Sequence, residues 1–166
     1  MRSSLLILCL VAVLCLPMSA AAATIYWTSS AAGCNVAPGS PATEDLSGVG
    51  VTYAAGSTST ASISLVCNVV PTDGTNSPAW TTLTLGYSNV TAAGQVFASV
   101  SEADGTGVSR AVSCVAQNPA TPTSGTVTCT LGTFAFDFTR YVYTVGITIG
   151  RSASTQHPQA NLVSLN

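Results

Sequence analysis

The sequence predicts an all-β protein, an antiparallel β-sandwich of the jelly-roll or immunoglobulin-like type, with about nine strands and two disulfides. Short stretches in which apolar and polar residues alternate recur along the chain, and no helical period competes with them. Clusters rich in Pro, Gly and Asp separate these stretches and are typical of tight turns. We expect strands to begin near Ile25, Val51, Ser59, Thr81, Val96, Val108, Thr126, Tyr141 and Leu162.

The alternating stretches assign one buried face to each predicted strand. From Ala61 to Val69 every second residue is apolar or Cys, and most residues between them are Ser or Asn. The stretches from Tyr141 to Gly150 and from Phe134 to Phe138 also alternate. Such alternation is typical of sheets with one buried and one solvated face. The predicted core therefore includes Ile63, Leu65, Leu83, Leu85, Phe136, Tyr143, Val145 and Ile147.

Residues 1–23 have the pattern of a signal peptide, and residues 24–166 are expected to form a single β-sandwich domain. Arg2 provides a positive start, Leu5 to Leu16 is apolar, and Pro17 is followed by small residues. The apolar run is shorter than the roughly 20 residues of a membrane span. We therefore expect a secreted, periplasmic or cell-surface protein without membrane insertion after cleavage of the signal.

The cysteines of the predicted domain are expected to form two disulfides, because export places the chain in an oxidising compartment. Pairing between successive strands favours Cys34–Cys67 and Cys114–Cys129, although four cysteines allow three connectivities. Zinc is the alternative ligand for cysteines. The chain has no C-x-x-C pair and only one histidine, His157, so we expect no metal at these positions.

The charge of the chain excludes two classes of partner. It contains six acidic residues, four arginines and no lysine, and Arg2 belongs to the predicted signal peptide. Nucleic acids and anionic lipids are bound through clusters of Lys and Arg, so we expect neither as a partner. Low charge also brings the surface closer to self-association.

Catalytic residues are scarce. His157 is the only imidazole, it lies in a polar stretch between predicted strands, and no G-x-S-x-G nucleophile motif occurs. The two candidate pairs of carboxylates, Glu44 with Asp45 and Glu102 with Asp104, lie in Gly- and Pro-rich loops, where carboxylates are usually solvated. We therefore predict that the protein is not an enzyme and carries no cofactor.

Two kinds of binding site have candidate residues. Trp80 and Trp27 offer apolar faces on which a sugar ring could stack, and Trp80 shares the outward parity of Thr82 if the strand extends that far. Glu102 and Asp104 could provide oxygens for a weak calcium site. The alternative for these acids is a hairpin turn stabilised by an Asp side chain.

The C-terminal third resembles a group of uncharacterised bacterial secreted proteins that are predicted to be β-sandwiches. The resemblance lies in Phe134–Phe138 (FAFDF), Tyr141–Val145 (YVYTV) and the Arg151–Ser152 pair that follows. In that group an F-D-F-like segment precedes a Tyr-rich penultimate strand, and a short last strand closes the chain. The resemblance spans Ala61 to Leu165 and implies a fold but no activity.

A second resemblance is to pilus subunits, in which a Cys near the mature N-terminus pairs with one in the next strand. Cys34 and Cys67 match this pattern, but the pair Cys114 and Cys129 and the chain end at Asn166 depart from it. We therefore expect a non-catalytic secreted surface, matrix or binding module whose partner is a protein or a glycan. The alternatives are a pilus-type structural subunit and a carbohydrate-binding module.

Overall fold

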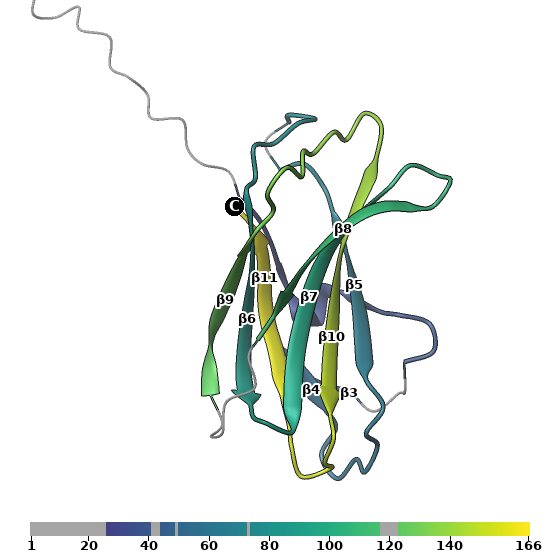
Figure 1. Cartoon of the computed structure of the whole chain (residues 1–166). Helices are drawn as coiled ribbons and strands as arrows, with labels where there is room; N and C mark the ends of the chain where they lie inside the picture. The colour runs from purple at the N-terminus through teal and green to yellow at the C-terminus, as the bar shows by residue number, and fades with distance from the viewer. Residues whose placement is uncertain (1–25, 41–43, 49, 73, 117–122) are drawn as a thin grey trace, which may run out of the picture.

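Two antiparallel sheets packed face to face form the protein (Figure 1). The computed structural model describes residues 26–40, 44–48, 50–72, 74–116 and 123–166, so the predicted signal peptide lies outside the described residues. The six-stranded sheet contains β3 (Glu44–Ser47), β4 (Gly50–Tyr53), β11 (Gln159–Leu165), β6 (Thr82–Val90) and β9 (Thr123–Thr130) in that order, with β1 (Trp27–Ser30) also against β11. The five-stranded sheet has the order β2 (Asn35–Val36), β5 (Ile63–Val69), β10 (Val142–Arg151), β7 (Gly94–Ala103) and β8 (Val108–Val115).

The pairing of strands is that of a jelly roll. β7 pairs with β8, β6 with β9, β5 with β10 and β4 with β11, so one long antiparallel ribbon folds into both sheets. The structure confirms the predicted sandwich and selects the jelly roll over the immunoglobulin-like alternative. Each of the nine predicted strands has a counterpart. The two additional ones, β2 and β3, are short strands at sheet edges.

The core lies between the sheets and follows the predicted alternation. All eight residues predicted to lie in the core are buried. In β5 and β10 every second side chain points inward, and Ile63, Leu65, Val145 and Ile147 are at most 1% exposed. Ala61 is exposed, contrary to the prediction, because β5 begins only at Ile63.

The alternating segment from Phe134 to Phe138 is a connection between β9 and β10 and not a strand. Its backbone forms turns: the N–H of Phe134 donates to the carbonyl of Leu131, and that of Tyr141 donates to the carbonyl of Asp137. The aromatic side chains nevertheless point inward. The rings of Phe136 and Tyr143 lie 4.8 Å apart, so this connection covers one end of the core.

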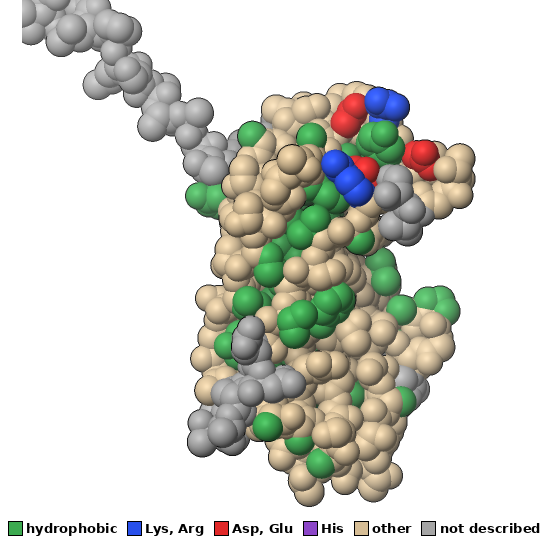
Figure 2. Space-filling view, viewed as in Figure 1, with side chains coloured by type: hydrophobic (Ala, Val, Ile, Leu, Met, Phe, Trp, Pro, Cys, Tyr) green, Lys and Arg blue, Asp and Glu red, His purple; other side chains and the backbone are tan. Residues whose placement is uncertain are grey.

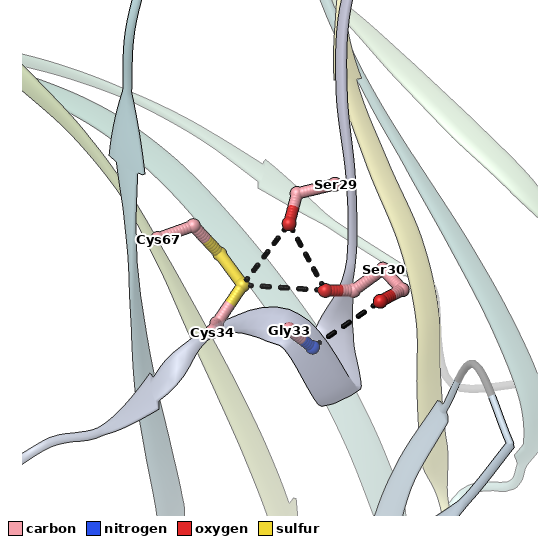
Figure 3. The surroundings of a disulfide bond; sticks show 5 residues. All are labelled: Ser29, Ser30, Gly33, Cys34 and Cys67. Atoms are coloured by element: carbon pink, nitrogen blue, oxygen red, sulfur yellow. Dashed lines mark hydrogen bonds between the residues drawn. A yellow bond between two sulfur atoms is a disulfide. The ribbon is translucent and has the colours of Figure 1, made fainter.

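Both predicted disulfides are present. Cys34 follows the short 3₁₀ helix η1 (Ala31–Gly33), and its bond to Cys67 attaches this helix to β5. Figure 3 shows the hydroxyl of Ser29 3.7 Å from the Cys34 sulfur. It also shows the N–H of Gly33 donating to the hydroxyl of Ser30 at 3.2 Å, which caps the helix.

The second disulfide, Cys114–Cys129, joins β8 of one sheet to β9 of the other. The two bridges therefore tie both sheets and the N-terminal segment together. Because disulfides form and persist in oxidising compartments, they indicate an extracytoplasmic location. In the part of the chain that the structure describes, no helix is long and apolar enough to cross a membrane.

We expect Val145→Asp to destabilise the fold strongly. The side chain of Val145 is fully buried, and a carboxylate there would lack a partner, at a cost of about 3 kcal/mol or more. Val142→Asp is the matched control, because Val142 lies in the same strand but is 66% exposed, and its change should stay within about 0.5 kcal/mol. Urea unfolding of both variants measures the difference. Equal stabilities would contradict the assigned parity of β10.

Candidate functional site

Neither tryptophan is available as a stacking platform, contrary to the prediction. Trp27 and Trp80 are each only 4% exposed. Trp80 precedes β6, which begins at Thr82, so the parity of that strand does not extend to it. Its ring packs edge-on against Phe136, with ring centres 5.0 Å apart, and so belongs to the aromatic end of the core.

The two candidate calcium ligands are engaged separately. Glu102 is buried near the end of β7, where its carboxylate pairs with the Arg110 guanidinium at 3.2 Å. Asp104 is exposed in the following turn and accepts the N–H of Thr106 at 2.9 Å and its hydroxyl at 2.6 Å. The hydroxyl bond lowers the pKa of Asp104. The Asp104 contacts form the hairpin turn stabilised by an Asp side chain, which was the alternative to a calcium site. Among the described residues, no group of three His, Cys, Asp or Glu could hold a metal ion.

His157 is exposed in the connection between β10 and β11, as the polar sequence around it predicts. Its neighbour Pro158 is buried and lies against Gly94. His157 therefore lies in a solvated loop, as expected from the sequence.

The outer face of the five-stranded sheet forms a broad surface without charge. We use the name outer face for the side chains of this sheet that point away from the core. Figure 2 shows the charged side chains gathered at one end of the visible face, while hydrophobic and uncharged polar groups occupy the rest. In the three central strands and β8, the outer face consists of Ser64, Val66, Asn68, Val142, Thr144, Gly146, Thr148, Gly150, Gln95, Phe97, Ser99, Ser101, Ala111, Ser113 and Val115.

Phe97 is the aromatic residue in the middle of this face. Strand register places Ser64, Thr148, Phe97 and Val115 in one row across β5, β10, β7 and β8. Phe97 is half-buried and Val115 is 47% exposed, so together they form an apolar patch between hydroxyl-bearing neighbours. Sequence reasoning missed Phe97. The signal was present, because Val96, Ala98 and Val100 are the inward residues of β7 and leave Phe97 pointing outward.

The outer face ends in a concavity of about 290 Å³ where β7 begins and β10 ends. Gly150 forms its floor, and the side chains of Ser62, Gln95 and Ser152 surround it. Gly150 pairs with Gln95 in the β10–β7 ladder. A Cβ atom at Gly150 would lie 3.4–3.5 Å from the side chains of Gln95 and Ser62.

Arg151 lies beside this concavity, but the N–H groups of its guanidinium are bonded to the protein. It is 5% exposed, and all five N–H groups of its guanidinium are directed at oxygen atoms of the protein. Nε donates to the carbonyl of Ser59, Nη1 to those of Ser154 and Gln156, and Nη2 to the carbonyl and hydroxyl of Ser57. These bonds hold the β4–β5 and β10–β11 connections together.

Tyr53 supports the guanidinium from the core side. Its ring lies 3.8 Å below the Arg151 guanidinium carbon, and its hydroxyl donates to the carbonyls of Ala61 at 2.9 Å and Ile149 at 3.1 Å. Burial raises the pKa of Tyr53, and the nearby positive charge of Arg151 opposes this only in part. The neutral phenol is therefore the form that the fold stabilises.

We expect Arg151→Met to destabilise the protein by about 3 kcal/mol, because it leaves several buried oxygens without a donor. The control is Arg140→Met. Arg140 is exposed and lies over the ring of Tyr141, so its loss should change stability by about 0.5 kcal/mol or less. Urea unfolding at neutral pH measures both values. Equal losses would show that the buried contacts of Arg151 do not stabilise the fold.

Alkaline pH should destabilise the protein through Tyr53. Because its folded pKa is raised, the stability it contributes is complete below about pH 10, the unfolded pKa, and is lost as pH rises through the folded pKa. Tyr53→Phe should lower stability at neutral pH and flatten its fall above pH 10, whereas the exposed Tyr26→Phe should leave the profile unchanged. Thermal unfolding from pH 7 to 11 checks this. A profile for Tyr53→Phe parallel to that of the unmodified protein would refute it.

Comparison with known proteins identifies no family. No family model matches the chain, and no curated protein matches its sequence. Among solved structures, the chain is similar to the enzymatically active domain of tailspike protein 4 from bacteriophage CBA120, with 11% identity, a TM-score of 0.46, and coverage of 85% of this chain and 19% of that one. It is also similar to a CBM4, a carbohydrate-binding module, with 12% identity, a TM-score of 0.28, and coverage of 84% and 81%. The chain thus spans about a fifth of the tailspike structure.

Proposed function

We propose that the protein is a non-catalytic secreted module that binds a neutral carbohydrate on the outer face of its five-stranded sheet. The observation that carries this proposal is the charge-free outer face with Phe97 in its middle. In this proposal Phe97 takes the role that the sequence analysis assigned to Trp80 and Trp27.

The chemistry of the outer face is complementary to that of a sugar. A pyranose ring presents an apolar C–H face and a rim of hydroxyl groups. The Phe97 ring and the Val115 side chain supply an apolar contact, while Ser64, Thr148 and Ser99 supply hydroxyls that both donate and accept. The outer-face residues named above include no Lys or Arg, so an anionic polymer would find no counter-charge among them. A neutral glycan suits both the apolar contact with hydroxyl groups around it and the lack of positive charge.

The absence of catalysis is part of the proposal and rests on where the titratable groups lie. Glu102 is paired with Arg110, Asp104 is bonded to Thr106, and His157 is exposed in a different connection. Among the described residues these groups do not converge on the outer face. General acid–base chemistry needs such groups within hydrogen-bond reach of the same bond.

A pilus-type subunit is the structural alternative. Such a subunit needs a sheet from which one strand is missing, so that a neighbouring molecule can donate it. Here the chain's own β11 lies between β4 and β6, and its residues Ala160, Val163 and Leu165 are fully buried. The core is thus closed by the last strand of the same chain, which favours a binding module.

We expect Phe97→Ala to weaken binding of a neutral glycan about tenfold or more, because it removes the aromatic contact at the centre of the site. The matched control is Leu162→Ala. Leu162 is 41% exposed on the six-stranded sheet, so its loss should leave affinity unchanged. A panel of neutral oligosaccharides and polysaccharides identifies the ligand, and calorimetry compares the variants.

Two results would contradict the proposal. If Phe97→Ala bound the glycan with wild-type affinity, the binding site would not lie on the outer face around Phe97. Hydrolysis of the bound glycan that is abolished by His157→Ala would show that the module is catalytic.

A further inference from the structure

On the basis of the proposed function, we infer that the concavity at the end of the outer face holds the terminal sugar residue of the glycan. The protein would then bind chain ends and not the interior of a polysaccharide. Its lining consists of Ser62, Ala92, Ala93, Gly94, Gln95, Gly150, Arg151 and Ser152.

The concavity lies in line with the aromatic contact. Gln95 and Phe97 are both outward residues of β7, and two residues along a strand span about 7 Å. On the neighbouring strand, Gly150 and Thr148 lie opposite them. A sugar chain that covers Phe97 and runs along these strands therefore places its next ring over Gly150.

Polar groups converge above Gly150. The position that a Cβ atom would take there is 3.4 Å from the side-chain nitrogen of Gln95 and 3.5 Å from the hydroxyl oxygen of Ser62. A sugar hydroxyl near this position can accept from the Gln95 amide and exchange a hydrogen bond with Ser62. Gly150 itself is buried, and the side chain of Gln95 lies against it.

Beyond Gly150 the concavity is bordered by two connections that are hydrogen-bonded to each other. The N–H of Ser152 donates to the carbonyl of Ala93 at 2.7 Å, and its hydroxyl donates to the same oxygen at 3.2 Å. These bonds join the β6–β7 and β10–β11 connections beyond Gly150. In our proposal a sugar chain that runs along the sheet toward Gly150 ends at these joined connections.

The lining also selects against a charged terminal sugar. The Arg151 guanidinium beside the concavity is saturated by carbonyl and hydroxyl oxygens of the protein, so it offers no N–H to a carboxylate. The remaining lining side chains are uncharged. A neutral hexose is the class of terminal residue that fits.

The test uses Gly150→Ala and Gln95→Ala in the full mature protein. An added methyl at Gly150 makes only ordinary contacts of 3.4–3.5 Å, so the variant should fold while taking up space in the concavity. The matched control is Gly86→Ala on the other sheet, where the added methyl would also have its nearest neighbours at 3.5 Å. Melting temperatures confirm that all three variants are folded.

The probes are neutral gluco-, manno- and galacto-configured oligosaccharides of one to six residues, the matching polysaccharides, and a uronic-acid oligosaccharide. We expect Gly150→Ala and Gln95→Ala to weaken oligosaccharide binding about three- to tenfold, with Gly86→Ala unchanged. Limited cleavage of a bound polysaccharide should raise its binding capacity in proportion to the number of chain ends.

The outcomes separate the two proposals. If Phe97→Ala loses binding but Gly150→Ala and Gln95→Ala bind like the wild type, the end-binding site is overturned and the outer face stands. Capacity that does not change with the number of chain ends also overturns it. Preferred binding of the uronic-acid oligosaccharide overturns the inference that the terminal sugar is neutral. A wild-type protein that binds no neutral glycan overturns both proposals.

Discussion

The buried guanidinium of Arg151 is the interaction on which the functional end of the sandwich depends. A charge out of water is costly unless every N–H finds an acceptor, and here backbone carbonyls and one serine hydroxyl supply all of them. The acceptors come from two connections that are far apart in sequence, the residues around Ser57 and those around Ser154. The contacts that stabilise Arg151 therefore join these two connections next to the concavity that Arg151 helps to line.

The jelly roll explains why one sheet face is free to bind. Nested pairing from β7–β8 outward to β4–β11 places the inward residues of every long strand in a shared core, so the opposite residues all face outward. In the five-stranded sheet these outward residues are small, hydroxylated or apolar. At the other end Glu102 pairs with Arg110, and the Arg110 guanidinium lies 4.6 Å from the ring centre of Phe134.

A site built on central strands has a further physical advantage. The β-ladder fixes the backbone of Phe97, Gln95 and Gly150 before any ligand arrives, so little conformational entropy is lost on binding. The Cys114–Cys129 bridge ties β8, which carries Val115, to the opposite sheet next to this patch. Weak individual contacts to sugar hydroxyls gain most from such a rigid arrangement, because each hydrogen bond replaces one to water and contributes only about 1 kcal/mol.

Alternation alone was enough to place Ile63, Leu65, Val145 and Ile147 in the core and to favour both disulfides, because the direction of a side chain in a strand is set locally. The outward position of Phe97 was equally readable. Whether a side chain is buried depends on residues that are distant in the sequence. Trp80 is buried by aromatic residues of a connection more than fifty positions away, the segment from Phe134 to Phe138 alternates without any strand beside it, and the carbonyls around Arg151 meet only when two connections are brought together. The sequence therefore determined the two faces of each strand, and the tertiary structure decided the strand order, the fate of the tryptophans and the concavity at the end of the outer face.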